Sequence, residues 1–161
     1  MQTSLEERLG RVEDRLQIEA LRAAFSDAAL LNDYERLASL FTADGALRMP
    51  DIPAELVGPE QIREFGRNRP ATFLVQTSHP GVLELDGDEA SGRTPMHELA
   101  GTRDGGSVMN FALYHDRYRR TPDGWRFTER VYELLYLDTT PLTGAPAASW
   151  RGAQAAAGAS E

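Results

Sequence analysis

Cysteine is absent from the 161 residues of this chain. Its absence excludes disulfide bonds, thiolate nucleophiles and cysteine-ligated zinc sites. Long apolar runs are absent too, since none approaches the roughly 18 residues that a membrane-spanning helix needs. The opening segment MQTSLEERLG has no apolar core of the kind found in signal peptides. We therefore expect a cytoplasmic protein that has no membrane partner.

Positive charge is scarce relative to negative charge. The chain carries 25 acidic residues against 17 basic ones, which gives a formal net charge of −8. An acidic surface repels the phosphate backbone of DNA and RNA. We therefore expect no nucleic-acid partner.

Motifs for metals and phosphates are also missing. The three histidines show no metal-ligand spacing, and neither HxH nor HExxH occurs. There is no glycine-rich phosphate loop, and the GxSxG motif of many hydrolases is absent. The sequence therefore predicts no metal and no cofactor.

The stretch that is most informative covers residues 18–41, IEALRAAFSDAALLNDYERLASLF. Apolar residues recur there at helical spacing, at Ile18, Leu21, Phe25 and Ala29. Asn32 and Asp33 interrupt the pattern, and a second, shorter helix follows from Tyr34 with Asp33 as its cap. Upstream, residues 4–17 extend the first helix, and Ser4 with Glu7 fits a capping box.

This upstream extension carries a narrow apolar stripe of its own. It consists of Leu5, Leu9, Val12 and Leu16. One interpretation is a helical arm that lies on its own domain. The other is a contact between two copies of the chain, since a narrow stripe is typical of a coiled-coil seam.

Four long extended segments follow a short strand at 45–49 and a helix at 59–68. They cover residues 72–85, 90–102, 108–120 and 125–137, and Asp-Gly or Gly-Gly turns separate them. Helices followed by such an antiparallel meander predict an α+β fold with helices on one face of a curved sheet. We expect one domain over residues 1–142 and a flexible Ala-, Gly- and Ser-rich tail over 143–161.

The order and spacing of these segments resemble SnoaL-like proteins. These are relatives of nuclear transport factor 2, scytalone dehydratase, ketosteroid isomerase and hexachlorocyclohexane dehydrochlorinase. The resemblance spans roughly residues 5–142 and rests on LEERLGRVEDRLQIEAL, NDYERLASLFTADG, VGPEQIREF, TSH at 77–79, YHDRYRRTPDGWRF and TPLTG. It implies a cone-shaped α+β barrel, in which a long N-terminal helix and two shorter helices close a curved, mostly antiparallel sheet over an apolar pocket.

The working residues of these relatives are only partly matched. His79 in TSH matches a histidine of the dehydratase-like members, whereas Leu30 stands where its partner aspartate would be. Met49, directly before Pro50, stands where the isomerase-like members carry a base. Tyr114 matches the oxyanion-stabilising acid of the isomerase, and a phenol at that place can donate a hydrogen bond to a developing oxyanion.

His79 and Tyr114 are therefore the predicted catalytic residues. An imidazole can accept and donate a proton near neutral pH, which suits general acid–base work. The alternative for His79 is a structural role at a strand kink, held by a backbone carbonyl. The alternative for Tyr114 is a place in the core with its hydroxyl bonded locally.

A wider set of residues is predicted to bind the substrate. It consists of Phe25, Met49, His97, Asn110, Arg130, Tyr132 and Leu134. Asn110 shares a strand face with Tyr114 by period-two alternation. The orientation of His97 is open: turned inward it would pair with His79, and turned outward it would lie on the surface.

The last strand allows two orientations. The resemblance turns Arg130, Tyr132 and Leu134 inward, whereas the opposite parity would turn Phe127, Glu129 and Val131 inward. An inward Arg130 needs a carboxylate, which Glu98 or an acidic substrate would supply.

Two functions follow from these observations. The first is a cofactor-free enzyme, a lyase or an isomerase, that acts on a mostly apolar, oxygenated small molecule by dehydration, isomerisation or cyclisation. The second is a non-catalytic binding or assembly module of the same fold, which Leu30 and Met49 favour. The resemblance also implies a homodimer that forms through the open face of the sheet.

Overall fold

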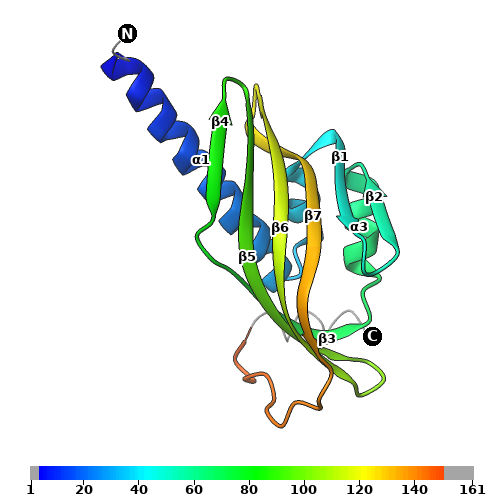
Figure 1. The fold of residues 1–161 in the computed structure, drawn as a ribbon. Coiled ribbons are helices and arrows are strands. Elements are labelled where there is room, and N and C mark those ends of the chain that lie inside the picture. Colours follow the sequence, from blue (N-terminus) through cyan, green and yellow to red (C-terminus); the bar gives the residue numbers. More distant parts are fainter. Residues whose placement is uncertain (1–3, 151–161) are drawn as a thin grey trace.

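Three helices and seven strands form the part of the chain that this computed structural model describes, residues 4–150. The helices are α1 (Leu5–Leu30), α2 (Tyr34–Ser39) and α3 (Pro59–Arg67). The strands are β1 (Phe41–Met49), β2 (Ala54–Val57), β3 (Ala71–Ser78), β4 (Val82–Asp86), β5 (Glu89–Thr102), β6 (Ser107–Thr121) and β7 (Gly124–Asp138). This order confirms the predicted α+β fold (Figure 1).

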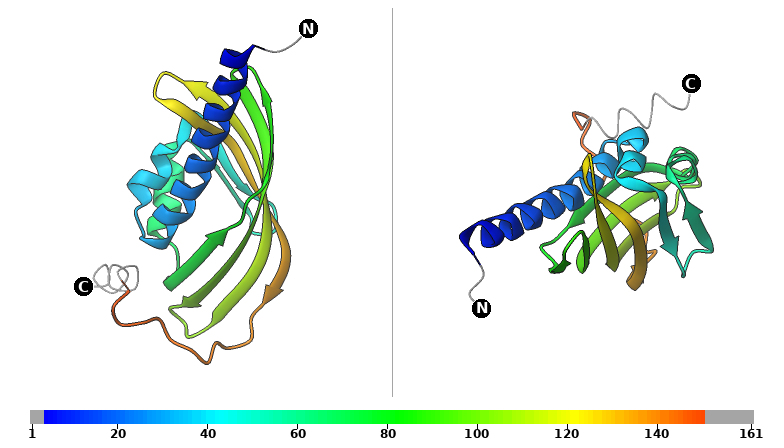
Figure 2. Two further views of the ribbon diagram at one scale, coloured as in Figure 1. Left: turned by 90° about the vertical axis from the view of Figure 1, so that its left-hand side faces the viewer. Right: turned by 90° about the horizontal axis from the view of Figure 1, so that it is seen from above.

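The strands form one curved sheet with the order β2-β1-β7-β6-β5-β3, and β4 also pairs with β5. All neighbours are antiparallel except β1 and β7, which run parallel. The three helices lie on the concave side of the sheet (Figure 2). The cone is therefore an open sheet that the helices cover, as the resemblance implied.

Local signals set the ends of the first two helices. The Glu7 backbone N–H donates to Ser4 Oγ at 3.1 Å, and the Ser4 N–H donates to a Glu7 carboxylate oxygen at 2.7 Å, which confirms the capping box. At α2 the Arg36 backbone N–H donates to Asp33 Oδ1 at 3.1 Å, which confirms Asp33 as the cap. The Ser4–Glu7 bonds fix the start of α1, and the Asp33 bond fixes the start of α2 at the corner that follows α1.

The first half of α1 projects beyond the sheet (Figure 1). Its apolar stripe is exposed, with fractions of 77% at Leu5, 56% at Leu9, 51% at Val12 and 65% at Leu16. The helix docks from Asp14 onward, because this carboxylate accepts bonds from the Arg120 guanidinium and the Trp125 indole N–H. The stripe therefore does not lie on its own domain, and the contact between two copies stays a prediction.

Residues 143–150 contain no helix or strand, and residues 151–161 lie outside the described part of the chain. The flexible tail and the single-domain boundary thus stay predictions. Within residues 4–150, no helix combines the length and the apolarity that crossing a membrane requires.

Candidate functional site

A cavity of about 510 Å³ lies between the helices and the concave face of the sheet. Most of its wall is apolar, with Phe25, Leu37, Met49, Ile62, Leu74 and Leu134 among the lining residues. Its polar lining residues are Tyr34, Asp51, Arg69, Gln76, Glu98, Thr102, Asn110, Tyr114 and Tyr132. An apolar cavity with a few polar groups is typical of a site for a small organic molecule.

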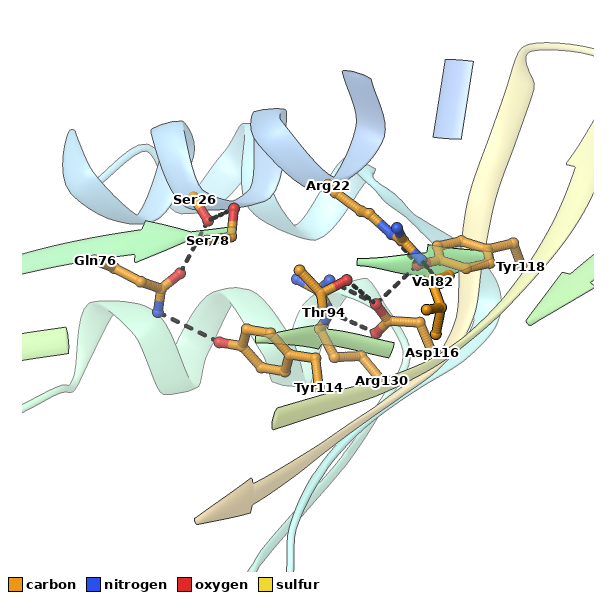
Figure 3. Close-up of polar contacts among 10 residues, drawn as sticks. All are labelled: Arg22, Ser26, Gln76, Ser78, Val82, Thr94, Tyr114, Asp116, Tyr118 and Arg130. Carbon is orange, nitrogen blue, oxygen red and sulfur yellow. Dashed lines mark hydrogen bonds and ion pairs between the residues drawn. The ribbon is translucent and has the colours of Figure 1, made fainter. Parts of the chain in front are cut away.

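A polar row crosses the wall of this cavity. Gln76, Glu98 and Asn110 lie opposite one another on β3, β5 and β6. The Gln76 amide donates to Glu98 Oε2 at 2.9 Å. It also donates to the Tyr114 hydroxyl at 3.3 Å (Figure 3). Gln76 therefore holds a carboxylate and a phenol beside each other on an otherwise apolar wall.

Two phenols form the next part of the wall. Tyr114 and Tyr132 are directly opposite on β6 and β7, with ring centroids 5.8 Å apart. Burial raises the pKa of both hydroxyls above the usual range, and the Glu98 carboxylate raises it further. The Arg130 guanidinium offsets this only partly at Tyr114. Both phenols therefore stay protonated and remain hydrogen-bond donors over the physiological pH range.

Asn110 is buried and incompletely bonded. Only 3% of this residue is exposed, and its Oδ1 has no hydrogen-bond partner among the described residues. A buried acceptor without a donor is costly and is rare in native proteins. Asn110 also lines the cavity, but this oxygen itself has almost no accessible surface.

Arg69 lies where α3 leads into β3. It donates to the Tyr34 hydroxyl at 3.0 Å, and its guanidinium also lies over the Tyr34 ring. The Nε of Arg69 is buried without a partner, and no ion pair to Arg69 occurs within residues 4–150. Both Arg69 and Tyr34 line the cavity.

Arg130 points inward, but it does not line the cavity. It bonds Asp116 in a bidentate ion pair, Nε to Oδ1 at 2.7 Å and Nη2 to Oδ2 at 2.8 Å. Its guanidinium lies against the rings of Phe25, Tyr114 and Phe127, at 4.4, 4.0 and 4.2 Å from their centroids. The predicted role in substrate binding is therefore wrong, because Asp116 already occupies the guanidinium.

The two orientations considered for the last strand are both partly realised. Phe127 and Arg130 are both buried, because the pairing of β6 with β7 shifts by one residue between Arg117 and Tyr118. The extra residue on β7 is Thr128, since Glu129 pairs with Arg117 and Phe127 with Tyr118. A bulge of this kind breaks strict alternation and could not be placed from the sequence pattern.

The Arg130–Asp116 pair is part of a buried network that ties α1 to the sheet (Figure 3). Asp116 accepts a bond from the Tyr118 hydroxyl at 2.8 Å, and this hydroxyl accepts one from Arg22 Nε at 2.7 Å. Arg22 also donates to the Val82 carbonyl at 2.9 Å. The Arg130 guanidinium of this network packs against the ring of Tyr114, so the network supports the cavity wall. Its own residues do not line the cavity.

His79 and His97 are not part of the cavity. His79 is exposed, and its Nε2 lies 2.9 Å from His97 Nδ1 on the outer side of the sheet. The reason is strand alternation: Leu74 and Gln76 point inward on β3, so the series places Thr77 and His79 outward. The predicted place of His79 in an enclosed pocket, and of His97 in the substrate wall, is therefore wrong. In residues 4–150 no set of three or more His, Asp or Glu side chains is arranged to hold a metal ion.

The contact between α1 and β3 explains why no acid–base dyad is present there. Ser26 Oγ donates to Ser78 Oγ at 3.0 Å and to Gln76 Oε1 at 3.5 Å (Figure 3). None of these groups titrates near neutral pH. Leu30, at the end of α1, is a partly buried apolar residue outside the cavity wall.

Six of the nine predicted site residues do line the cavity. They are Phe25, Met49, Asn110, Tyr114, Tyr132 and Leu134. Sequence reasoning missed Gln76 and Arg69, and it considered Glu98 only as a partner for Arg130. A signal for Glu98 existed, because Met96, Glu98 and Ala100 alternate toward the concave face of β5.

Comparison with known proteins agrees with this geometry. The model of the SnoaL-like domain family matches residues 10–131. The chain belongs to the SnoaL-like domain family. An uncharacterized protein of Mycobacterium tuberculosis is 30% identical to this SnoaL-like protein over 130 residues, which cover 76% of this chain and 86% of the relative.

Solved structures of similar shape include an enzyme. The crystal structure of LinA superimposes with a TM-score of 0.78 and 25% identity over 88% of this chain and 97% of LinA. LinA is described as a hexachlorocyclohexane dehydrochlorinase. A nuclear transport factor 2-like protein with a cystatin-like fold from Novosphingobium aromaticivorans superimposes with a TM-score of 0.73 and 25% identity, over 84% of this chain and 92% of that one.

Proposed function

We propose that this SnoaL-like protein is a cofactor-free enzyme that moves a proton on a mostly apolar, oxygenated small molecule. The reaction class is elimination of water, isomerisation or ring closure, and the site is the cavity of about 510 Å³. The family and the likeness to LinA support an enzyme that processes a small molecule. The observation that carries the proposal is a carboxylate, Glu98, beside two protonated phenols in an apolar enclosure.

In this proposal Glu98 accepts a proton from the carbon next to a carbonyl group. The carbonyl oxygen gains negative charge as the proton leaves, and Tyr114 and Tyr132 donate hydrogen bonds to it. Glu98 then returns the proton, and the place of its return decides the product. Return to another carbon gives an isomer, and return to a departing β-hydroxyl group releases water and gives a dehydrated product. Attack of the carbanion on a second carbonyl closes a ring, and the proton goes to the alkoxide that forms. Gln76 positions Glu98 through its amide.

Exchange of hydrogen for deuterium tests the common first step of all three reactions. We expect the protein in deuterium oxide to accelerate deuterium uptake at the α-carbon of a tetralone, a bicyclic ketone. Glu98→Gln should slow the catalysed exchange by about 100-fold or more, because general-base assistance is lost. Tyr114→Phe and Tyr132→Phe should each slow it by up to about 100-fold, since each removes an oxyanion donor.

Glu133→Gln is the matched control. Glu133 bonds His115 on the exposed side of the sheet and does not line the cavity. This variant should retain the exchange rate of the unmodified protein. A chain that binds the tetralone but never accelerates exchange would instead be a binding module, the second function considered from the sequence.

A further inference from the structure

The arm of α1, residues 5–16, projects beyond the sheet with a row of large apolar side chains open to solvent (Figure 1). Each member of the row is more than half exposed: Leu5, Leu9, Val12 and Leu16. The capping box at Ser4 holds the first turn of the arm, and the other end continues into the docked half of the same helix. The arm is therefore a preformed helix, which needs no partner to nucleate it.

The row faces away from the domain to which the arm belongs. Each of its members lies nine positions before a buried residue of α1, and these buried residues are, in order, Asp14, Ile18, Leu21 and Phe25. Nine residues make about two and a half turns of an α-helix. The row therefore lies on the side of α1 opposite to the docked face, so a second helix can reach it without meeting the sheet.

The spacing of the row is that of a two-stranded coiled coil. Its steps are four, three and four residues, so Leu9 and Leu16 take position a of a seven-residue repeat, and Leu5 and Val12 take position d. The neighbouring e and g positions are charged, so only two positions in each repeat are apolar. A row of this width is the seam between two helices, whereas packing into a larger core needs a wider apolar face.

The charges beside the row indicate the partner and its direction. Glu6 and Glu13 take position e, and Arg8 and Arg15 take position g. In a parallel pair of identical helices, Arg8 of each copy lies beside Glu13 of the other. An antiparallel pair would instead bring Arg8 beside Arg15 and Glu6 beside Glu13. Within residues 4–150 neither Arg8 nor Glu13 forms an ion pair, so both are available to a second copy.

We propose that the arm forms a parallel, in-register coiled coil with the arm of a second copy of this chain. The same apolar residue of the two copies then packs together at each level of the seam, and two Arg8–Glu13 ion pairs flank it. No residue of the arm lines the cavity, so this inference does not depend on the proposed function.

Disulfide formation between introduced cysteines tests the pairing, because the chain has no cysteine of its own. Leu16→Cys places two thiols opposite each other in the proposed seam. Gln17→Cys is the matched control, since Gln17 is an exposed neighbour outside the row. In a glutathione redox buffer, Leu16→Cys should form at least about tenfold more linked dimer than Gln17→Cys, measured on a non-reducing gel. Equal linkage of the two variants, or no linkage of Leu16→Cys, would overturn the pairing.

A mixture of two variants tests the direction of the pair. In an antiparallel pair Leu16 would lie beside Leu5 of the other copy, and the two Leu16 residues would be about 16 Å apart, too far for a disulfide. Leu16→Cys should therefore link to itself and not to a Leu5→Cys chain that carries a mass tag. Preferential linkage between Leu16→Cys and Leu5→Cys would overturn the parallel arrangement.

Charge reversal in the Leu16→Cys chain tests the register. Arg8→Glu and Glu13→Arg each turn two attractive pairs into repulsive ones, so each should lower the linked fraction by about fivefold or more. The double variant Arg8→Glu/Glu13→Arg restores opposite charges and should recover the linkage. A double variant that links no better than the single variants would overturn the proposed register.

The arm is a surface separate from the outer face of the sheet. Phe111→Glu places a charge on that outer face, where Phe111 is 47% exposed. Added to the Leu16→Cys chain, this change should leave the linked fraction unchanged. Loss of the linkage would overturn the arm as an interface in its own right.

Discussion

Tyr114 and Tyr118 show how burial of single side chains couples the fold to pH. They are 4% and 1% exposed, and burial raises the pKa of both phenols. In the unfolded chain a phenol ionises at about pH 10, whereas in the folded chain both stay protonated beyond that pH. Unfolding above about pH 10 therefore releases protons, so stability that is complete below this pH is lost as the pH rises.

The expected result is a steep alkaline loss of stability. Each phenol should lower the free energy of unfolding by up to about 1.4 kcal/mol per pH unit above about pH 10. Urea unfolding at a series of alkaline pH values measures how steeply the free energy of unfolding falls with pH. Tyr114→Phe should reduce this slope by the contribution of one phenol. An unchanged slope in Tyr114→Phe would contradict this assignment.

Single polar residues also decide what the cavity can bind. Glu98 carries the negative charge in the polar row, and Gln76 satisfies one of its oxygens at 2.9 Å. Arg130 carries a positive charge nearby, but its guanidinium forms a bidentate ion pair with Asp116. A ligand in this cavity would therefore meet the Glu98 carboxylate and the phenols, whereas the Arg130 guanidinium does not line the cavity.

The corner formed by α2 and α3 closes one side of the cavity. Gly66 of α3 lies against the ring of Tyr34, and an added Cβ there would overlap that ring. The Arg69 guanidinium lies over the same Tyr34 ring. The contact between these two helices therefore sets the position of Arg69 at the cavity wall.

Gly66→Ala should separate the two helices. Helix propensity favours alanine by about 1 kcal/mol, but the overlap with Tyr34 should cost about 1–3 kcal/mol. Gly10→Ala in the exposed arm of α1 is the control, because nothing lies within 4 Å of its added Cβ. Thermal unfolding should show that Gly66→Ala is less stable than Gly10→Ala, and equal stability would contradict the tight contact.

The elements differ in how well the sequence predicts them. The capping box at Ser4 and the Asp33 cap depend on residues close in sequence, so they were predictable. The parallel pairing of β1 with β7 joins distant segments, and the bulge at Thr128 depends on that sheet. Tyr132 and Leu134 line the cavity, the side to which the resemblance turned them. Arg130 has the carboxylate partner that the sequence required, but this partner is Asp116 and not Glu98.

His79 illustrates the limit of a motif match. TSH matches its relatives in sequence, but the orientation of a side chain at a strand end depends on where the strand stops. β3 ends at Ser78, and the following residue points to the outer side of the sheet. A sequence pattern fixes which residues are near each other along a strand, but the exact strand end decides on which side they lie.

The outer face of the sheet is the surface on which the predicted homodimer depends. His97, Phe111 and Tyr136 lie opposite one another on β5, β6 and β7, and Phe111 and Tyr136 are 47% and 53% exposed. Exposed aromatic residues that lie together are typical of protein interfaces. Among residues 4–150, this face and the stripe on the α1 arm are two apolar surfaces that a second copy could contact.

Light scattering distinguishes the two surfaces. If the sheet face forms the dimer, Phe111→Glu should give the mass of one chain, because a buried unpaired charge is costly. Leu5→Glu, on the α1 arm, should then keep twice that mass. The reverse pattern would assign the dimer to the arm, and a single-chain mass for the unmodified protein would contradict a homodimer.

The molecule as a whole presents an open curved sheet whose concave face is covered by three helices (Figure 2). The Glu98 carboxylate and the protonated phenols of Tyr114 and Tyr132 line the cavity between them. Deuterium uptake at the α-carbon of a tetralone tests whether these groups move a proton. The rates to compare are those of the unmodified protein and of Glu98→Gln. We expect acceleration by the unmodified protein and a loss of about 100-fold or more in Glu98→Gln. Equal rates in the two proteins would contradict proton transfer by Glu98.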